Sequence, residues 1–165
     1  MVKGGSLSGK EMQLVVFHLQ EEDFGVDIRQ VKEVLKLSQV THLPHTAEYI
    51  EGVINLRGEV IPVINLRKRF GIPGEQQGHE GQWVIIVEIE GTQVGLTVDS
   101  VAEVIRLPLE AIERPSSTIA GTKSQFLEGV GKHNDRLLII LKLETILTTE
   151  ERISLSDLHD WSEDD

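Results

Sequence analysis

Short apolar runs, separated by brief polar segments, recur along the whole chain. Gln13–Leu19 and Trp83–Ile89 are two such runs, and each is followed by a polar turn and by a second run entered through Gly25 or Gly95. Two β-strands joined by a short polar turn are typical of this pattern. The sequence therefore predicts a β-hairpin in each place.

Further short elements follow each hairpin. In each copy we expect a third strand, then a hairpin opened by YIEGV or FLEGV, then a single helical turn. In the first copy the third strand is Val31–Leu37, the return strand of the hairpin is Glu59–Asn65 and the helical turn is Leu66–Phe70. In the second copy the corresponding elements are Val101–Leu107, Arg136–Leu141 and Leu143–Leu147. Many short strands with few helices are typical of barrels rather than of α/β sheets. The prediction is an all-β protein with two small barrels.

The two halves of the chain are related by an internal duplication. LVVFHLQEEDFGVDIRQVKEVLKL, from Leu14, aligns without a gap with VIIVEIEGTQVGLTVDSVAEVIRL, from Val84, so that Gly25 falls on Gly95. YIEGV and FLEGV then place Gly52 on Gly129. We expect these four glycines at turns or close approaches of the backbone. The copies suggest subdomains of roughly 13–80 and 81–147, with possible exchange of a strand or helix at the seam.

The two ends differ from this repeat. Residues 1–12 are rich in Gly and Ser and predict a flexible tail. In residues 148–165, the sequence Thr148-x-x-Glu151 has the form of a helix capping box, and WSEDD ends the chain. We therefore expect a short C-terminal helix followed by an acidic tail.

Composition narrows the function. The chain has 39% hydrophobic but only 4% aromatic residues, so its core must come from Val, Ile and Leu. A net charge of −11 argues against nucleic-acid binding, which needs a basic surface. No apolar run is long enough to span a membrane, and there is no signal-peptide core, so we expect a cytoplasmic protein without direct membrane insertion.

Motifs for catalysis or for cofactor binding are weak. The sequence has no cysteine and no nucleophile motif, and its six histidines are scattered. GGSLSGK, from Gly4, resembles a phosphate-binding loop but continues with Glu11 and follows no predicted strand. We expect no enzymatic activity, no cofactor and no metal site.

Arg57 departs from the repeat. The second copy has Asn134-Asp135, ordinary turn residues, where the first has Arg57-Gly58. A guanidinium is not needed to make the turn, so it could contact a partner. It could equally form an internal salt bridge, to Glu51 or Glu59. The residues alone leave both interpretations open.

EYIEGVINLRGEVIPVINLRKRFGI, from Glu48, closely resembles the signature segment of the CheW family, the coupling proteins of bacterial chemotaxis. FGVDIRQVKEV and VGLTVDSVAEVIRL resemble the flanking strands of that family. The resemblance runs from about Gln13 to Leu147. NLRG followed by IPVINLR is specific for the wider CheW-like domain, which also occurs in the kinase CheA and in CheV.

The resemblance implies two five-stranded SH3-like barrels around a shared hydrophobic core and a non-catalytic adaptor. Its implied partners are the regulatory domain of CheA and the cytoplasmic tip of chemoreceptors, to whose membrane-associated arrays the protein would be recruited. The positions that match receptor-contact residues of the family are Val31, Glu33, Arg57 and Val104. For a kinase surface we can point to Leu37, Val40 and Leu43.

Two alternatives remain from the sequence. A CheW-like protein could serve another array, such as one that controls twitching motility. A small ligand-binding barrel would need a polar pocket, and the sequence does not reveal one.

Overall fold

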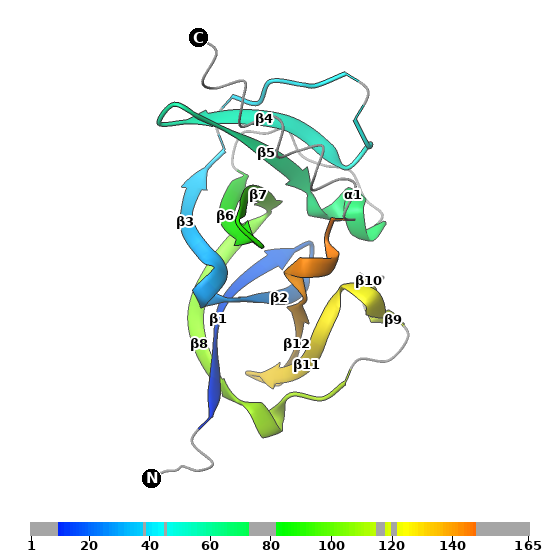
Figure 1. Cartoon of the computed structure of the whole chain (residues 1–165). Coiled ribbons are helices and arrows are strands. Elements are labelled where there is room, and N and C mark those ends of the chain that lie inside the picture. The colour runs from blue at the N-terminus through cyan, green and yellow to red at the C-terminus, as the bar shows by residue number, and fades with distance from the viewer. Residues whose placement is uncertain are drawn as a thin grey trace.

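The computed structural model describes residues 10–37, 39–44, 46–72, 82–114, 118–119 and 122–147. Strands dominate, and they form two five-stranded sheets and a two-stranded one (Figure 1). The first strand begins at Glu11, two residues earlier than predicted. Most of the predicted N-terminal tail, and the predicted helix and acidic tail of residues 148–165, lie outside the described residues.

One five-stranded sheet, here called barrel 1, has the strand order β11-β12-β2-β1-β8. β12 and β2 run parallel, and the other neighbours are antiparallel. The strands are β1 (Glu11–Leu19), β2 (Glu22–Asp27), β8 (Ser100–Pro108), β11 (Leu127–His133) and β12 (Arg136–Leu141).

The other five-stranded sheet, barrel 2, has the order β3-β6-β7-β5-β4, and here the parallel pair is β5 and β7. Its strands are β3 (Val31–Lys36), β4 (Ile50–Leu56), β5 (Glu59–Asn65), β6 (Trp83–Ile89) and β7 (Thr92–Val98). The two orders correspond strand for strand under the duplication.

Each barrel combines strands from both copies of the repeat. The β1–β2 hairpin, from the first copy, pairs with β8 and β12 of the second. The β6–β7 hairpin, from the second copy, pairs with β3 and β5 of the first. A cut of the chain near residue 80 would therefore separate each hairpin from the sheet to which it belongs. This exchange makes the two barrels interdependent.

Two backbone bridges close the sheets into barrels. After β3 the chain bends back, and Thr41 and Val53 of β4 exchange N–H···O bonds of 2.8 Å in both directions. After β8, Glu113 and Val130 of β11 do the same, also at 2.8 Å. In each case the bridge joins the continuation of one edge strand to the opposite edge. Together with the strand orders, these bridges confirm the predicted all-β fold of two five-stranded barrels.

The glycine before each bridge lies where the backbones approach closely. A Cβ on Gly52 would lie 2.1 Å from the carbonyl oxygen of Thr41, and its φ is 147°. A Cβ on Gly129 would lie 2.5 Å from Cγ2 of Ile112. In the hairpins, a Cβ on Gly95 would be 2.8 Å from Cγ2 of Val84, whereas one on Gly25 would meet only ordinary contacts, the nearest at 3.5 Å.

Three clusters of buried side chains form the core. Leu14, Ile105 and Leu138 belong to a small cluster inside barrel 1, and Ile61 and Ile86 to one inside barrel 2. The largest cluster takes residues from both barrels and lies between them. Along a strand, residues of this shared cluster alternate with residues of the cluster inside the barrel, because successive side chains point to opposite faces of a sheet. The shared core therefore joins the two barrels.

A row of aromatic rings runs through the shared core. Phe17 of β1 stacks on Phe24 of β2 with ring centroids 5.7 Å apart, and Phe24 stacks on Phe70 at 5.9 Å. Phe70 lies 5.3 Å from Phe126, which precedes β11. Few aromatic residues are present, but these four link both copies.

The remaining elements are short. They are η1 (Ile28–Gln30), α1 (Leu66–Phe70), η2 (Leu109–Ala111), the paired strands β9 (Thr118–Ile119) and β10 (Thr122–Lys123), η3 (Ser124–Phe126) and η4 (Leu143–Thr145). The structure thus has both predicted helical turns, the second as a 3-10 turn. In the described part of the chain, no helix has the length and apolar character that crossing a membrane needs.

Polar contacts of α1 join the barrels. Arg67 of α1 pairs with Asp99 at 2.6 Å, and the same carboxylate accepts a bond of 2.6 Å from the Gln20 backbone N–H in the β1–β2 turn. Arg69 donates from Nε to the carbonyl of Ile146 at 2.6 Å. Its guanidinium also covers the ring of Tyr49, 4.4 Å from the centroid. Burial lowers the pKa of Arg69.

Pro62 lies in an inner strand, although a proline in a predicted strand usually indicates an edge. β5 runs between β4 and β7, so an edge position does not explain this proline. The ladder to β7 begins only at Val63, and at Pro62 the strand pairs with β4 alone. The proline is therefore placed just before the second ladder starts.

Candidate functional site

The tips of two equivalent hairpins carry different chemistry on the same backbone. In barrel 2, Arg57 and Gly58 have φ of 52° and 88°; in barrel 1, Asn134 and Asp135 have φ of 53° and 62°. Two successive residues with positive φ are typical of the two-residue turn that best suits the twist of a hairpin. Asn and Asp tolerate this conformation, while a long side chain rarely adopts it. Arg57 therefore occupies a place where the turn itself favours another residue.

Arg57 forms an ion pair with Glu33 of β3. Its Nη2 pairs with Oε2, and Nη1 donates to Oε1 at 3.4 Å. Hydrogen bonding to Glu33 is the main cause that raises the pKa of Arg57. The side chain of Arg57 is 69% exposed and that of Glu33 28%. The pair thus joins the hairpin tip to edge strand β3 on an accessible surface.

The internal partner of Arg57 differs from the two predicted ones. Glu51 is buried and accepts a hydrogen bond of 2.5 Å from Asn65 Nδ2, so it serves the fold. Asn65 in turn caps α1 by accepting from the Lys68 backbone N–H at 3.1 Å. Glu59 adds only a weaker electrostatic influence on Arg57. The sequence did not predict the pairing of Arg57 with Glu33, because the distance between the hairpin tip and β3 depends on how the barrel closes.

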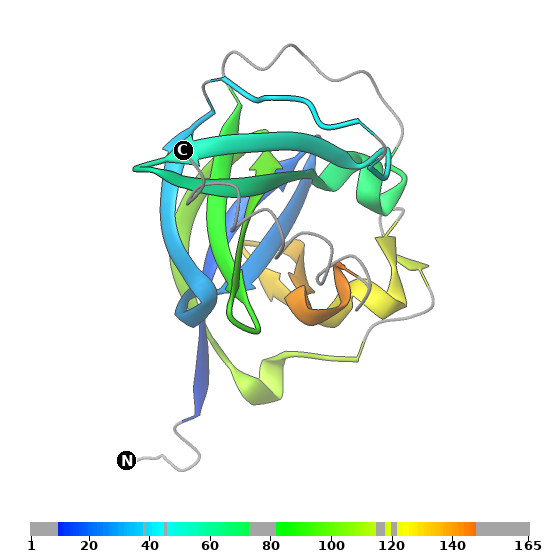
Figure 2. The ribbon, with the colours of Figure 1, turned by 45° about the horizontal axis from the view of Figure 1, so that its top comes forward.

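The other two candidate receptor contacts lie on the edge strands. Val31, at the start of β3, is half-buried against the shared core. Val104, on β8 of barrel 1, is 52% exposed. β3 and β8 lie along one side of the molecule in both ribbon views (Figures 1 and 2). The structure thus brings Glu33 and Arg57 into contact and places Val104 on the equivalent strand of the other barrel.

The candidate kinase contacts have different exposures. Leu37 is only 7% exposed and packs inside barrel 2. Val40 packs beside that cluster and Leu43 beside the shared core, and both are half-buried. Of the three, only Val40 and Leu43 leave part of their side chains accessible to a partner.

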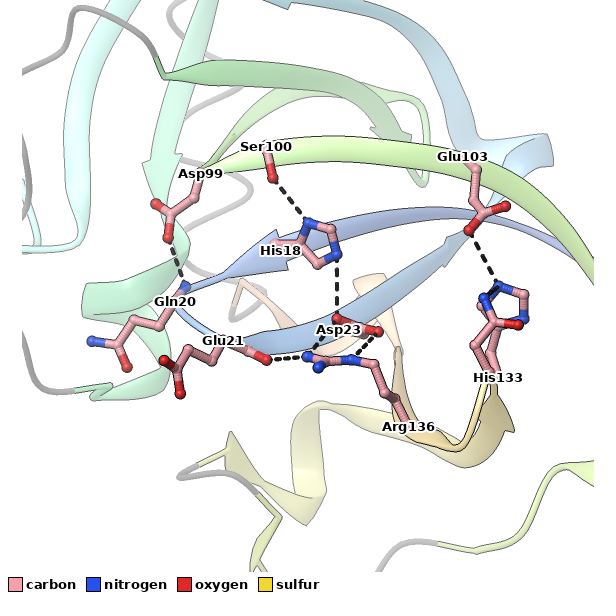
Figure 3. A network of polar contacts seen from close by, with 10 residues as sticks. His18, Gln20, Glu21, Asp23, Asp99, Ser100, Glu103, His133 and Arg136 are labelled. Atoms are coloured by element: carbon pink, nitrogen blue, oxygen red, sulfur yellow. Dashed lines mark hydrogen bonds and ion pairs between the residues drawn. The ribbon is translucent and has the colours of Figure 1, made fainter.

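Barrel 1 has a polar network at the end that corresponds to the Glu33–Arg57 end of barrel 2 (Figure 3). Buried Asp23 of β2 accepts two hydrogen bonds from the guanidinium of Arg136 on β12. Nε donates to Oδ2 at 2.9 Å and Nη2 donates to Oδ1 at 3.1 Å. His18 Nε2 lies 3.3 Å from the same carboxylate, and its Nδ1 lies 2.9 Å from Ser100 Oγ. The network joins four strands of barrel 1, because Ser100 is the first residue of β8.

A second, smaller contact lies beside this network. His133, the last residue of β11, has its Nε2 3.2 Å from Oε2 of Glu103 on β8. Glu103 is the duplicate of Glu33, and His133 directly precedes the tip residue Asn134. In both barrels, therefore, the glutamate of the edge strand meets the tip region of the second hairpin.

The sequence did not reveal this polar end of barrel 1. Aligning Glu33 with Glu103 and Arg57 with Asn134 relates the two ends, but it gives no distance between strand and tip. His18 and Asp23 reach the site only because the β1–β2 hairpin belongs to the barrel built mainly from the second copy. A pocket of about 610 Å³ with polar lining residues, which the sequence does not reveal, lies here.

Comparisons with known proteins agree with the strand pattern. A model of the CheW-like domain family matches residues 13–151. A chemotaxis protein CheW from Treponema pallidum is 32% identical over 156 residues, which cover 93% of this chain and 92% of that protein. One from Klebsiella aerogenes is 36% identical over 148 residues, covering 89% of this chain and 87% of that protein.

A solved structure shows the same fold. The crystal structure of the scaffolding protein TtCheW from Thermoanaerobacter tengcongensis superimposes with a TM-score of 0.79 at 42% sequence identity. The match covers 87% of this chain and 97% of that one.

Proposed function

The chain belongs to the CheW family, and from this premise we propose that it is a non-catalytic adaptor that couples chemoreceptors to the histidine kinase CheA in bacterial chemotaxis. The proposal places it in the cytoplasm, recruited to membrane-associated receptor arrays. The family and the scaffolding relative support this role.

The observation that carries the receptor part of the proposal is the position of Arg57. The duplicated turn folds with Asn134, yet Arg57 adopts the same left-handed conformation and stays accessible while Glu33 orients it. An exposed ion pair adds little stability, so folding alone gives a weak reason for an arginine here. A guanidinium held in a fixed direction suits recognition of carboxylates and carbonyls on a partner.

We assign the receptor tip to the side formed by β3 and β8. Val31 and Val104 would contact apolar positions of a helical partner, and Glu33 and Arg57 would contact its polar ones, as in recognition of an amphipathic helix. The kinase surface would use Val40 and Leu43 in the segment that closes barrel 2. The two partners would then occupy separate surfaces of one adaptor.

Co-sedimentation tests this role. Membranes containing a chemoreceptor, purified CheA and this protein are mixed, and pelleted protein and CheA autophosphorylation are measured. We expect the wild-type protein to join the pellet and to raise kinase activity. Absence of both effects, with a correctly folded protein, would contradict the coupling role.

Variants separate the two surfaces. Arg57→Asn, which suits the turn, should reduce recruitment to receptor membranes about tenfold or more while leaving binding to soluble CheA unchanged. Val40→Asp should do the reverse. Leu109→Ser, at an exposed leucine of barrel 1, is the control and should behave as wild type. Equal recruitment of Arg57→Asn and wild type would remove Arg57 from the receptor site.

A further inference from the structure

The pocket of barrel 1 is a built polar site with a rigid floor. Asp23 is 6% exposed, and Arg136 and His18 occupy both of its oxygens. With Nδ1 of His18 accepting from the Ser100 hydroxyl and Nε2–H donating to Asp23, a neutral ring satisfies the whole floor. With a neutral ring, the floor of Asp23, Arg136 and His18 carries no net formal charge.

The rim of the pocket carries excess negative charge. Glu103 and the exposed Glu21 line it together with the Asn134 amide. Counting Asp23 and Arg136 as well, the lining has three carboxylates and one guanidinium, so its formal charge is −2 with neutral histidines. Glu103 is half-exposed, and its side-chain partner among the described residues is the His133 ring. This leaves acceptor capacity on the rim, since a carboxylate can accept several hydrogen bonds.

The duplicate of this place is filled by a cation. In barrel 2 the glutamate equivalent to Glu103 is Glu33, and Arg57 from the hairpin tip lies against it. In barrel 1 the equivalent tip residue is Asn134, whose side chain is too short to do the same and bonds to His133 instead, at 3.2 Å. One fold thus presents the same glutamate twice, once with a guanidinium from its own chain and once with an open pocket beside it.

We propose that the pocket of barrel 1 receives an arginine or lysine side chain of a protein partner, which pairs with Glu103 as Arg57 pairs with Glu33 within the chain. The occupant is a basic side chain because a carboxylate rim over a neutral floor attracts a cation and repels an anion. Arginine fits best, since its planar fork can bond Glu103 and the neighbouring amide oxygens together. None of the lining residues is a proposed receptor or kinase contact, but Glu103 directly precedes Val104 on β8, so the site borders the proposed receptor surface.

A titration with a single side-chain analogue tests the pocket without receptor or kinase. N-acetyl-arginine amide is added to isotope-labelled protein, and backbone and histidine signals are followed by NMR; N-acetyl-citrulline amide is the neutral probe of the same shape. We expect saturable shifts at Glu103, His133 and Asn134 with the arginine probe and at least tenfold weaker binding of the citrulline probe. Equal binding of both probes, or shifts elsewhere only, would overturn the proposal.

Three variants check the anchor. Glu103→Gln should weaken binding of the arginine probe tenfold or more, whereas Glu110→Gln, an exposed glutamate on η2 of the same barrel, should not. Asn134→Arg with Asp135→Gly copies the Arg57-Gly58 tip into barrel 1 and should exclude the probe by filling the pocket from within. Probe binding that survives Glu103→Gln would overturn the proposal even if the double variant failed to fold.

Discussion

The two barrels have corresponding strand orders and an equivalent edge-strand glutamate, but the contacts of that glutamate differ. In barrel 2, Glu33 holds Arg57 on an accessible surface. In barrel 1, Glu103 faces a histidine and a pocket whose floor is an internal ion pair. The difference shows that the turn and the barrel closure do not require a cation. Comparing the two copies therefore separates the turn and the barrel closure, which both copies have, from the Arg57 cation, which only the first copy has.

The barrel closures should give the largest effect in this comparison. In Gly52→Ala the new Cβ would collide with the Thr41 carbonyl at a positive φ, so backbone must move. In Gly129→Ala the new Cβ would lie 2.5 Å from a side-chain methyl of Ile112, which can shift, and 2.9 Å from the Glu113 carbonyl oxygen, a milder backbone clash than the 2.1 Å at Gly52. We expect Gly52→Ala to cost about 3 kcal/mol or more and Gly129→Ala about 1–3 kcal/mol.

Urea unfolding followed by circular dichroism measures both costs. Gly25→Ala, whose added Cβ meets ordinary contacts, is the control and should stay close to wild type. If Gly129→Ala lost more stability than Gly52→Ala, the contacts of the added Cβ would not explain the difference between the two barrel closures.

The junction between the copies should come next. Arg69 and Ile146 are equivalent positions of the repeat, yet Arg69 donates to the Ile146 carbonyl and stacks on Tyr49. Arg69→Met keeps much of the apolar stem but removes the hydrogen bond and the cation, so we expect a loss of about 2–3 kcal/mol. Thermal unfolding measures it, with the exposed neighbour changed in Lys68→Met as the control. A loss no larger than that of the control would mean that the barrels are joined by apolar packing alone.

The architecture could be predicted where the pattern was local. Three hairpin strands, Glu59–Asn65, Trp83–Ile89 and Arg136–Leu141, have the predicted bounds, because polar turn residues adjoin these apolar runs. The exchange of hairpins between barrels is not visible in such a pattern, since it depends on which sheet edge each hairpin pairs with. The glycine pairs were found by alignment, but only the structure shows that Gly25 and Gly95 differ in crowding.

The candidate site was predictable in part. The repeat identified Arg57 as a departure, and the resemblance supplied Val31, Glu33 and Val104. The contact between Glu33 and Arg57 is long-range and follows from barrel closure, so the nearest carboxylates along the chain, Glu51 and Glu59, were the wrong partners. The polar end of barrel 1 was not predicted because its members come from three segments far apart in sequence.

A smaller effect concerns the corner after the first hairpin of each copy. Asp27 accepts from the Arg29 backbone N–H at 2.9 Å and pairs with its guanidinium at 2.7 Å; the equivalent residue of the second copy is Thr97. The hydrogen bond from the Arg29 side chain is the main cause that lowers the pKa of Asp27. Arg29 is exposed, so we expect Asp27→Asn, which keeps a capping oxygen, to cost about 1 kcal/mol at pH 7.

This cost should depend on pH in a defined direction. Because the pKa of Asp27 is lower in the folded state, its stabilisation is complete above the unfolded value of about 3.9 and is lost as pH falls through the folded-state pKa. The difference between wild type and Asp27→Asn should therefore shrink as denaturant titrations move from pH 7 to below pH 4. A difference that stays constant over this range would assign the cost to geometry and not to charge.

The smallest effect on stability should come from the Glu33–Arg57 pair itself. Both partners are accessible, so a double-mutant cycle with Glu33→Gln and Arg57→Asn should give a coupling below about 1 kcal/mol. Arg57→Asn alone should stay within about 0.5 kcal/mol, because asparagine suits the left-handed turn as Asn134 does in barrel 1. Arg57→Ala should be the less stable of the two, because alanine lacks that tolerance. A coupling of several kcal/mol would instead make the pair a structural clasp of barrel 2. The two barrels would then differ in how they are closed, and the stability of the pair, not contact with a partner, would explain Arg57.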